Sequence, residues 1–214
     1  MPGDWAIGSE DVLIVVDVQN DFCPGGALGV AGGDEVVPIV NALGRRFEHV
    51  VLTQDWHPAG HGSFASSHPG RAPFQTVAAA YGEQVLWPDH CVQGSAGAAF
   101  HPDLALDRAQ LVLRKGFRRE IDSYSAFREN DRRTATGLAG WLRERGLRRL
   151  FLAGLATDFC VAWSALDGRR EGFDVIVLED ACRAIDLDGS LDAARRAMVT
   201  AGVVLLDSAS IRPG

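Results

Sequence analysis

The sequence alternates between short, almost wholly apolar runs and longer segments in which apolar residues recur with the period of an α-helix. The first apolar run covers residues 12–16, an expected helix follows at about 34–47, and a second run covers 49–54. Runs that are apolar at every position, rather than at every second position, are typical of strands buried on both faces. The pattern therefore predicts a parallel sheet covered by helices.

The same alternation resumes after residue 100. Strands are expected at residues 110–114, 149–155, 174–178 and 203–206, and helices at 134–145, 158–170 and 190–201. With the first two runs, this makes a βα repeat of six strands, which predicts a three-layer α/β/α sandwich with a mainly parallel sheet of Rossmann-like topology. No internal repeat or change of composition marks a boundary, so we expect residues 1–214 to form a single domain.

One stretch interrupts the alternation. Between about residues 56 and 100 the chain is rich in Gly, Ser, Pro and His, and this stretch is far longer than the roughly 4 to 6 residues of a typical connection. Long connections within a compact domain are usually functional. We therefore expect this stretch to be a long loop that binds a metal or a substrate.

Composition narrows the range of partners. The chain has 28 acidic and 21 basic residues and a net charge of -7, the wrong sign for a surface that binds nucleic acid phosphates. No apolar run approaches the ~20 residues needed to span a bilayer, so no membrane partner is expected. The first residues have neither the basic nor the apolar part of a signal peptide, which predicts a cytoplasmic location. In that reducing compartment the four cysteines are expected to be thiols.

Chemically capable side chains follow four of the expected strands. Asp17 follows the first strand, Asp55 and His57 the second, Lys115 the third and Cys160 the fourth. Ligands of an open parallel sheet bind beyond the carboxyl ends of its strands. A single polar residue at such a position is most often a turn former. Four sets of them at one edge of the sheet indicate a functional site.

Cys160 is the strongest candidate for a nucleophile. Thr157 is expected to cap the helix that begins beside it, which places Cys160 in the first turn among unpaired amide hydrogens. Together with the Lys115 cation, this environment is expected to lower the pKa of the thiol, and the amides of the turn could hold an oxyanion. Asp17, desolvated at the end of an apolar strand, is suited to accept and return protons. These groups make a cysteine-hydrolase arrangement in which no histidine need act as the base.

Histidines are concentrated in the long expected loop, with five of the six between residues 57 and 101. Asp55 and His57 lie two residues apart at a strand end, and we expect them to bind one divalent metal ion together with His90, leaving positions open for water. Zinc is the first choice for these nitrogen and oxygen donors, with iron or manganese as alternatives. Whether His61 is a further ligand is left open.

Several segments of the chain carry distinctive motifs. They are residues 17–22 (DVQNDF), 25–28 (GGAL) with 32–34 (GGD), 53–57 (TQDWH), 61–64 (HGSF), 87–94 (WPDHCVQG), 115–116 (KG), 122–127 (DSYSAF) and 154–160 (GLATDFC). Together they are highly specific, and the resemblance that they carry extends over almost the whole chain. The sequence in this way resembles the nicotinamidases of the cysteine-hydrolase superfamily, which also contains isochorismatases and N-carbamoylsarcosine amidases.

The resemblance implies an isochorismatase-like fold and hydrolysis of nicotinamide to nicotinate and ammonia through a cysteine thioester, a reaction of NAD salvage. Pyrazinamide is implied as a second substrate. By the resemblance Cys160 is the nucleophile, Asp17 the proton carrier and Lys115 the third catalytic residue, in agreement with the strand-end argument.

The resemblance also implies the layout of the substrate pocket. A metal held by Asp55, His57 and His90 would orient the pyridine ring. The oxyanion hole would be formed by the amides of Ala156 and Cys160, beside a cis peptide bond between residues 155 and 156. The side chains implied to line the ring are Phe22, Leu28, Trp87 and Tyr124.

Two other functions fit part of the pattern. Another amidase or an isochorismatase of the same superfamily would share the fold, but a metal-free relative has no reason to carry the three metal-binding residues. A catalytically silent binding protein would keep the pocket, but it has no reason to keep the nucleophile, the carboxylate and the lysine together. The sequence leaves a homo-oligomer open.

Overall fold

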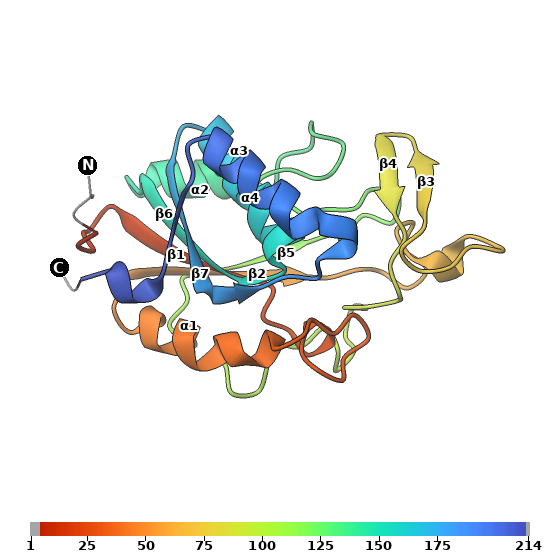
Figure 1. Cartoon of the computed structure of the whole chain (residues 1–214), viewed down its shortest axis with the longest axis horizontal. Coiled ribbons are helices and arrows are strands. Elements are labelled where there is room, and N and C mark those ends of the chain that lie inside the picture. Colours follow the sequence, from red (N-terminus) through yellow and green to blue (C-terminus); the bar gives the residue numbers. More distant parts are fainter. Residues whose placement is uncertain (1–4, 213–214) are drawn as a thin grey trace.

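Six strands form one parallel sheet at the centre of the structure, a computed structural model that describes residues 5–212 (Figure 1). Their order across the sheet is β5-β2-β1-β6-β7-β8, and each neighbouring pair is parallel. The strands are β1 (Asp11–Val16), β2 (His49–Asp55), β5 (Leu111–Lys115), β6 (Arg149–Leu155), β7 (Asp174–Arg183) and β8 (Val204–Leu206). The predicted three-layer fold with a six-stranded sheet is confirmed.

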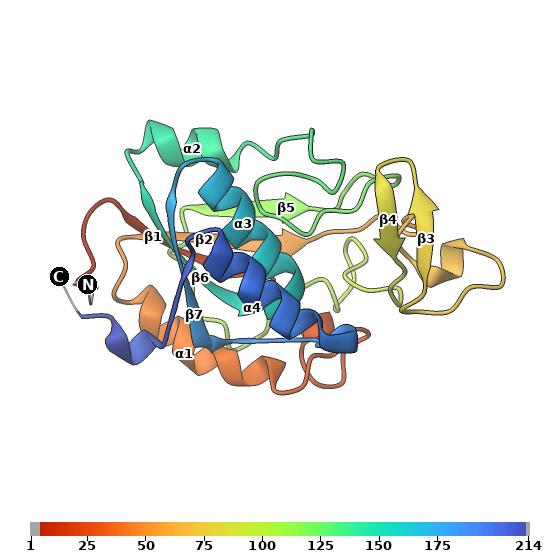
Figure 2. The same cartoon turned by 45° about the horizontal axis from the view of Figure 1, so that its top comes forward.

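Helices cover both faces of this sheet (Figures 1 and 2). On one face lies α1 (Val36–Gly44), and on the other lie α2 (Leu138–Glu144), α3 (Ala162–Arg170) and α4 (Ser190–Thr200). Because it is covered from both sides, β1 is buried along its whole length, as its unbroken apolar sequence predicts. None of the described helices is long and apolar enough to cross a membrane.

The strand order reverses between β1 and β6, the two central strands. From β1 the chain builds outward through β2 to β5, and it then returns to place β6 beside β1 and builds outward on the other side. The crevice at the carboxyl ends of such a pair is where open α/β sheets bind ligands. Asp17 directly follows β1 and Cys160 lies in the turn after β6, so the topology brings both residues to this crevice.

Several element boundaries differ from those expected, three of them by four residues or more. The helix expected from residue 134 begins at Leu138, because Asp131 accepts hydrogen bonds from the backbone and hydroxyl of Thr134 and holds a turn there. The strand expected at 174–178 extends to Arg183. The helix expected at 158–170 begins as a π-helical turn, Thr157–Val161, which leads into α3. Cys160 lies in that π-helical turn.

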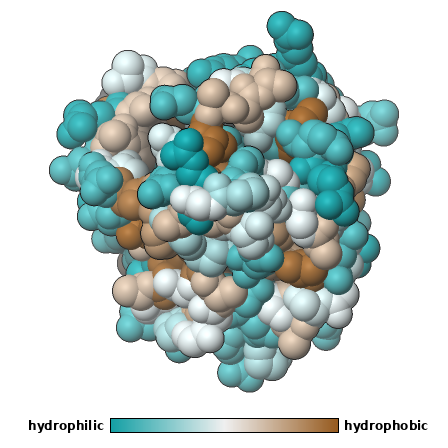
Figure 3. Space-filling model, turned by 90° about the vertical axis from the view of Figure 1, so that its right-hand side faces the viewer, coloured by the Kyte–Doolittle hydropathy of each residue, from teal (hydrophilic) through white to brown (hydrophobic). Residues whose placement is uncertain are grey.

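Between β2 and β5 the described chain has no α-helix, and the expected long loop takes its place. This connection also contains a small antiparallel hairpin that the sequence did not predict, formed by β3 (Thr76–Ala79) and β4 (Gly82–Val85). The hairpin projects beyond the carboxyl ends of β2 and β5 (Figure 2). Seen from that end, polar and apolar side chains are interspersed over the surface (Figure 3).

Candidate active site

Asp17, Lys115 and Cys160 are in contact at the carboxyl ends of three strands. The Lys115 Nζ atom lies 2.8 Å from Asp17 Oδ2 and 3.4 Å from Cys160 Sγ. It also donates a hydrogen bond to the carbonyl oxygen of Ser123 at 3.0 Å. All three side chains are buried. The structure therefore brings together the three residues that the sequence singled out for catalysis.

Asp17 is held on both of its carboxylate oxygens. Oδ1 accepts a hydrogen bond from Thr53 Oγ1 at 2.7 Å, and Oδ2 faces the Lys115 ammonium. Burial raises the pKa of Asp17, and the nearby Lys115 offsets this rise only in part. A carboxylate with a raised pKa is suited to take up and release a proton during a reaction near neutral pH.

The thiol of Cys160 does not have the lowered pKa that the sequence predicted. Burial has the largest effect and raises its pKa well above the ordinary value; Lys115 lowers the pKa, but Asp17 raises it again. The turn also begins earlier than expected, because Ala156 rather than Thr157 is the residue before its first helical position. Loss of water around the buried thiol raises its pKa by more than the Lys115 cation lowers it. Cys160 therefore rests as a thiol and needs a base.

A second cluster, formed by Asp55, His57 and His90, lies beside the first. Asp55 Oδ2 is 3.2 Å from His57 Nε2 and 3.5 Å from His90 Nε2. The other ring nitrogens face backbone carbonyls: His57 Nδ1 lies 2.9 Å from the oxygen of Gly116, and His90 Nδ1 lies 2.8 Å from that of Pro88. One ligand atom from each of the three residues falls within 4.8 Å of the others.

These contacts fit a divalent metal ion. A neutral imidazole that donates its Nδ1 hydrogen to a carbonyl presents a lone pair at Nε2. In His57 and His90 these lone pairs face the same Asp55 oxygen, an arrangement that a cation between them would satisfy. The carbonyl contacts also fix the orientation of both rings, as they do in many metal sites.

His61, whose role the sequence left open, forms a second candidate group with His57 and Asp122 rather than with Asp55 and His90. Its Nδ1 lies 2.7 Å from Ser63 Oγ, and its Nε2 lies 2.8 Å from the carbonyl oxygen of Arg118. Its ring packs against His57 with 4.3 Å between the ring centroids. Both ring nitrogens of His61 face protein groups, and its ring packs against that of His57.

Lys115 connects the two clusters. Besides its contact with Asp17, its Nζ atom donates to Asp55 Oδ1 at 2.9 Å. Residue spacing alone does not predict this link, because it leaves the order of the strands across the sheet open. The signal is the strand register, since β5 lies beside β2 and pairs Lys115 with Asp55.

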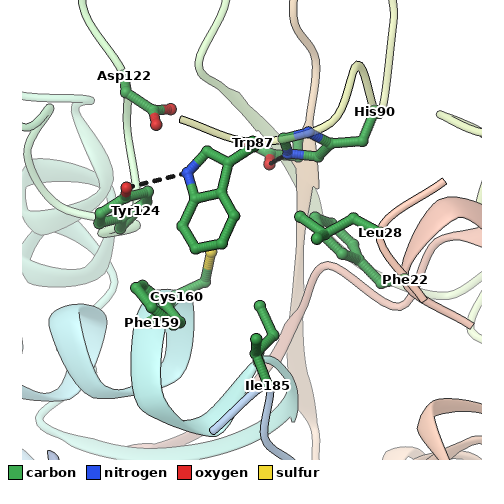
Figure 4. A pocket seen from close by; sticks show the side chains of 11 residues that line it. Phe22, Leu28, Trp87, His90, Asp122, Tyr124, Phe159, Cys160 and Ile185 are labelled. Carbon is green, nitrogen blue, oxygen red and sulfur yellow. Dashed lines mark hydrogen bonds and ion pairs between the residues drawn. The ribbon is translucent and has the colours of Figure 1, made fainter. Parts of the chain in front are cut away.

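An apolar pocket of about 320 Å³ opens between the clusters (Figure 4). Trp87 Nε1 donates to Tyr124 Oη at 3.0 Å, which fixes one wall. The peptide bond between Leu155 and Ala156 is cis, as the resemblance implied. The pocket is lined by the four expected residues Phe22, Leu28, Trp87 and Tyr124, by Asp55, His90, Ala156 and Cys160, and by three that the sequence did not single out, Asp122, Phe159 and Ile185.

Comparison with known proteins places this site in a family. Residues 11–210 match the isochorismatase domain. The chain belongs to the isochorismatase family. Within this family, the nicotinamidase of Acinetobacter baylyi is 56% identical to the chain over 199 residues, which are 93% of either protein.

Solved structures of the isochorismatase family have the same fold. A nicotinamidase and pyrazinamidase of Acinetobacter baumanii superimposes with a TM-score of 0.94 at 55% identity, covering 94% of this chain and 98% of that one. PnC1 of L. infantum in complex with nicotinate gives a TM-score of 0.85 at 44% identity, covering 97% and 98%. A pyrazinamidase of Pyrococcus horikoshii in complex with zinc gives 0.75 at 36% identity, covering 92% and 99%.

Proposed function

We propose that this member of the isochorismatase family is a nicotinamidase, which hydrolyses nicotinamide to nicotinate and ammonia. The contacts of Lys115 carry the proposal, because this one ammonium joins the thiol of Cys160 and the carboxylate of Asp17 to the metal ligand Asp55. The high identity to a nicotinamidase and the similarity to a nicotinate complex support the choice of substrate. Pyrazinamide keeps a ring nitrogen in the same relation to its carboxamide and is proposed as a second substrate.

In the first half of the reaction, the Asp17 carboxylate takes the proton of the Cys160 thiol, and the thiolate adds to the carboxamide carbon. The amide hydrogens of Ala156 and Cys160 hold the resulting oxyanion. The carbon–nitrogen bond then breaks, and Asp17 returns its proton to the leaving nitrogen, which departs as ammonia. Lys115 stabilises the thiolate and keeps Asp17 in place throughout.

In the second half, water hydrolyses the thioester. Asp17 takes a proton from the attacking water, the carbon–sulfur bond breaks, and the proton returns to the Cys160 sulfur. The thiol is restored, and the carboxylic acid product releases its remaining proton to solvent and leaves as nicotinate. Forming a thioester divides one difficult amide hydrolysis into two easier steps.

We assign Asp55, His57 and His90 as the residues that hold a metal ion, with zinc as the first choice. Their nitrogen and oxygen donors suit zinc, and the pyrazinamidase of Pyrococcus horikoshii was solved with zinc. When bound, the metal would supply a Lewis acid for the pyridine nitrogen and so orient the ring. The side chains of Phe22 and Trp87, which line the pocket, would pack against that ring.

Replacement of the nucleophile tests the proposed reaction. Cys160→Ala should lower ammonia release from nicotinamide by on the order of 10⁴-fold or more and still bind the ring. The matched control is Cys182→Ala, since Cys182 is also a buried thiol but does not line the pocket. An acid-quenched sample of the unsubstituted protein should carry one nicotinoyl group on Cys160. Turnover retained by Cys160→Ala would exclude the assignment.

A single domain of residues 1–214 is supported by the hydrophobic cluster, which runs from Val12 to Ile211 without division. The cytoplasmic location and a homo-oligomer stay predictions from the sequence.

A further inference from the structure

Asp122 is a buried carboxylate in the pocket that the proposed reaction does not use. It is 2% exposed and lines the pocket, with its carboxylate near the end that carries His90 (Figure 4). One of its oxygens lies within 4.8 Å of ring nitrogens of both His57 and His61. Asp122 therefore lies beside His57, one of the three proposed metal ligands.

Two neutral amides hold this carboxylate in place. Asp122 Oδ1 accepts a hydrogen bond from the backbone N–H of Ser123 at 2.8 Å, and Oδ2 accepts one from Gln84 Nε2 at 2.9 Å. Gln84 is itself buried, and its Nε2 atom also lies 3.0 Å from Tyr124 Oη. These bonds orient Asp122 but do not compensate its charge. A buried carboxylate whose charge is not compensated destabilises the fold.

Asp122 is the buried carboxylate of this region that Lys115 does not pair with. Asp17, Asp55 and Asp122 are all buried, and the Lys115 ammonium pairs with the first two. A divalent cation held by Asp55, His57 and His90 would lie close to Asp122, because an oxygen of Asp122 is within 4.8 Å of a ring nitrogen of His57.

We propose that Asp122 is an outer carboxylate of the metal centre, a positioning residue that adds negative charge beside a divalent ion and accepts hydrogen bonds from water on the ion. Asp122 forms a group with His57 and His61, separate from the group of Asp55, His57 and His90, and amides already orient both of its oxygens, which favours an outer position over direct ligation. Gln84 on β4 holds it in position, which gives the β3–β4 hairpin a role in metal binding. The inference rests on the metal site of the proposed function.

Metal affinity measured by chelator competition, without substrate, tests this inference. Asp122→Asn keeps the shape of the side chain and removes its charge, and it should weaken zinc binding about 10- to 100-fold, as loss of an outer partner typically does. The control is Asp167→Asn, which removes another buried carboxylate, one paired with Arg132 and Arg170 on α3. The control should leave zinc affinity unchanged.

A purely structural role for Asp122 gives a different result. If the role is structural, Asp122→Asn should lower the melting temperatures of the metal-free and metal-loaded forms equally. If Asp122 supports the metal, the substitution should reduce the difference between these two melting temperatures. Zinc affinity that is unchanged in Asp122→Asn overturns the inference, even if the KM for nicotinamide changes. If that variant does not fold, Gln84→Met decides, because it leaves the carboxylate but removes its donor: weakened zinc binding supports the inference and unchanged binding overturns it. Failure of the unsubstituted protein to bind zinc would instead contradict the metal site itself.

Discussion

Among the single residues of the site, Lys115 is the one that pairs with two buried carboxylates. Its ammonium lies within 2.9 Å of one oxygen of Asp17 and of one oxygen of Asp55, and it is almost completely buried. Asp17 and Asp55 share Lys115 as their cation. Their negative charges raise the pKa of Lys115 well above its ordinary value. The lysine is therefore expected to matter for folding as well as for catalysis.

Lys115→Met keeps the length of the side chain and removes the charge. We expect a loss of activity of about 10²- to 10⁴-fold, because Asp17 is no longer held and the thiolate is no longer stabilised. The free energy of unfolding should fall by about 3 to 5 kcal/mol, since two buried carboxylates lose their partner. Ammonia release and urea unfolding measure the two effects. Arg114→Met, on an exposed position of the same strand, is the control; equal behaviour of the two variants would contradict the expectation.

The raised pKa of Asp17 predicts the acid side of the pH profile. The reaction needs Asp17 ionised, so kcat/KM for nicotinamide should fall as the pH falls through this raised value. The midpoint should lie above about 3.9, the ordinary value for an aspartate. The same shift means that the protonated form of Asp17 favours the folded state at low pH and that this contribution is lost as the pH rises through the folded pKa. A midpoint at or below the ordinary value would show that burial does not control this group.

At the scale of elements, β1 and β6 approach each other closely where both lead into the site. Val16 pairs with Gly154, whose φ is +120°, and a Cβ atom at Gly154 would lie 2.1 Å from the carbonyl oxygen of Val16. Any side chain at this position would force apart the two strands that carry Asp17 and Cys160. The close approach of β1 and β6 at this crevice therefore requires glycine at position 154.

Gly154→Ala should lower the free energy of unfolding by about 3 kcal/mol, from the clash and the unfavourable φ together. Urea unfolding measures the change. Gly140→Ala is the matched control, because Gly140 lies within α2 with open space around it. That replacement should be neutral or stabilise by up to about 1 kcal/mol, the helix-propensity difference between the two residues. Similar losses from both variants would contradict the close approach of the strands.

The main sheet could be predicted from the sequence because its strands are buried on both faces and so read as unbroken apolar runs, as in β1. The convergence of Asp17, Lys115 and Cys160 followed from the same reading, since parallel strands end at one edge. The β3–β4 hairpin could not be predicted, because its strands have four residues each and mixed exposure. The raised pKa of Cys160 and the position of Asp122 depend on which groups meet in space, which residue spacing alone does not specify.

At the scale of the whole molecule, the metal cluster joins the sheet to the long connection between β2 and β5. Asp55 ends β2, whereas His90 comes from the far part of that connection, after the hairpin. A bound metal would therefore hold two distant parts of the chain together, and its loss would leave the buried negative charges uncompensated.

Removal of the metal should lower the melting temperature by about 5 to 10 °C, the shift expected when a ligand at roughly 100 times its Kd is lost from a chain of this size. Thermal unfolding followed by circular dichroism, before and after treatment with a chelator, measures the change. Zinc added in excess of the chelator should restore the original value. A melting temperature that does not respond to the chelator or to zinc would contradict this role.

The connection between β2 and β5 also separates bond breaking from ring recognition. The groups proposed to cleave the amide, Asp17, Lys115 and Cys160, are fixed at the ends of central strands, whereas Trp87 and His90 belong to the connection. Loops can change in length and composition without altering the strands that they join. Mutations confined to this connection would therefore change which ring the pocket binds and leave the residues that cleave the amide unchanged. By this route one fold can evolve to act on different substrates.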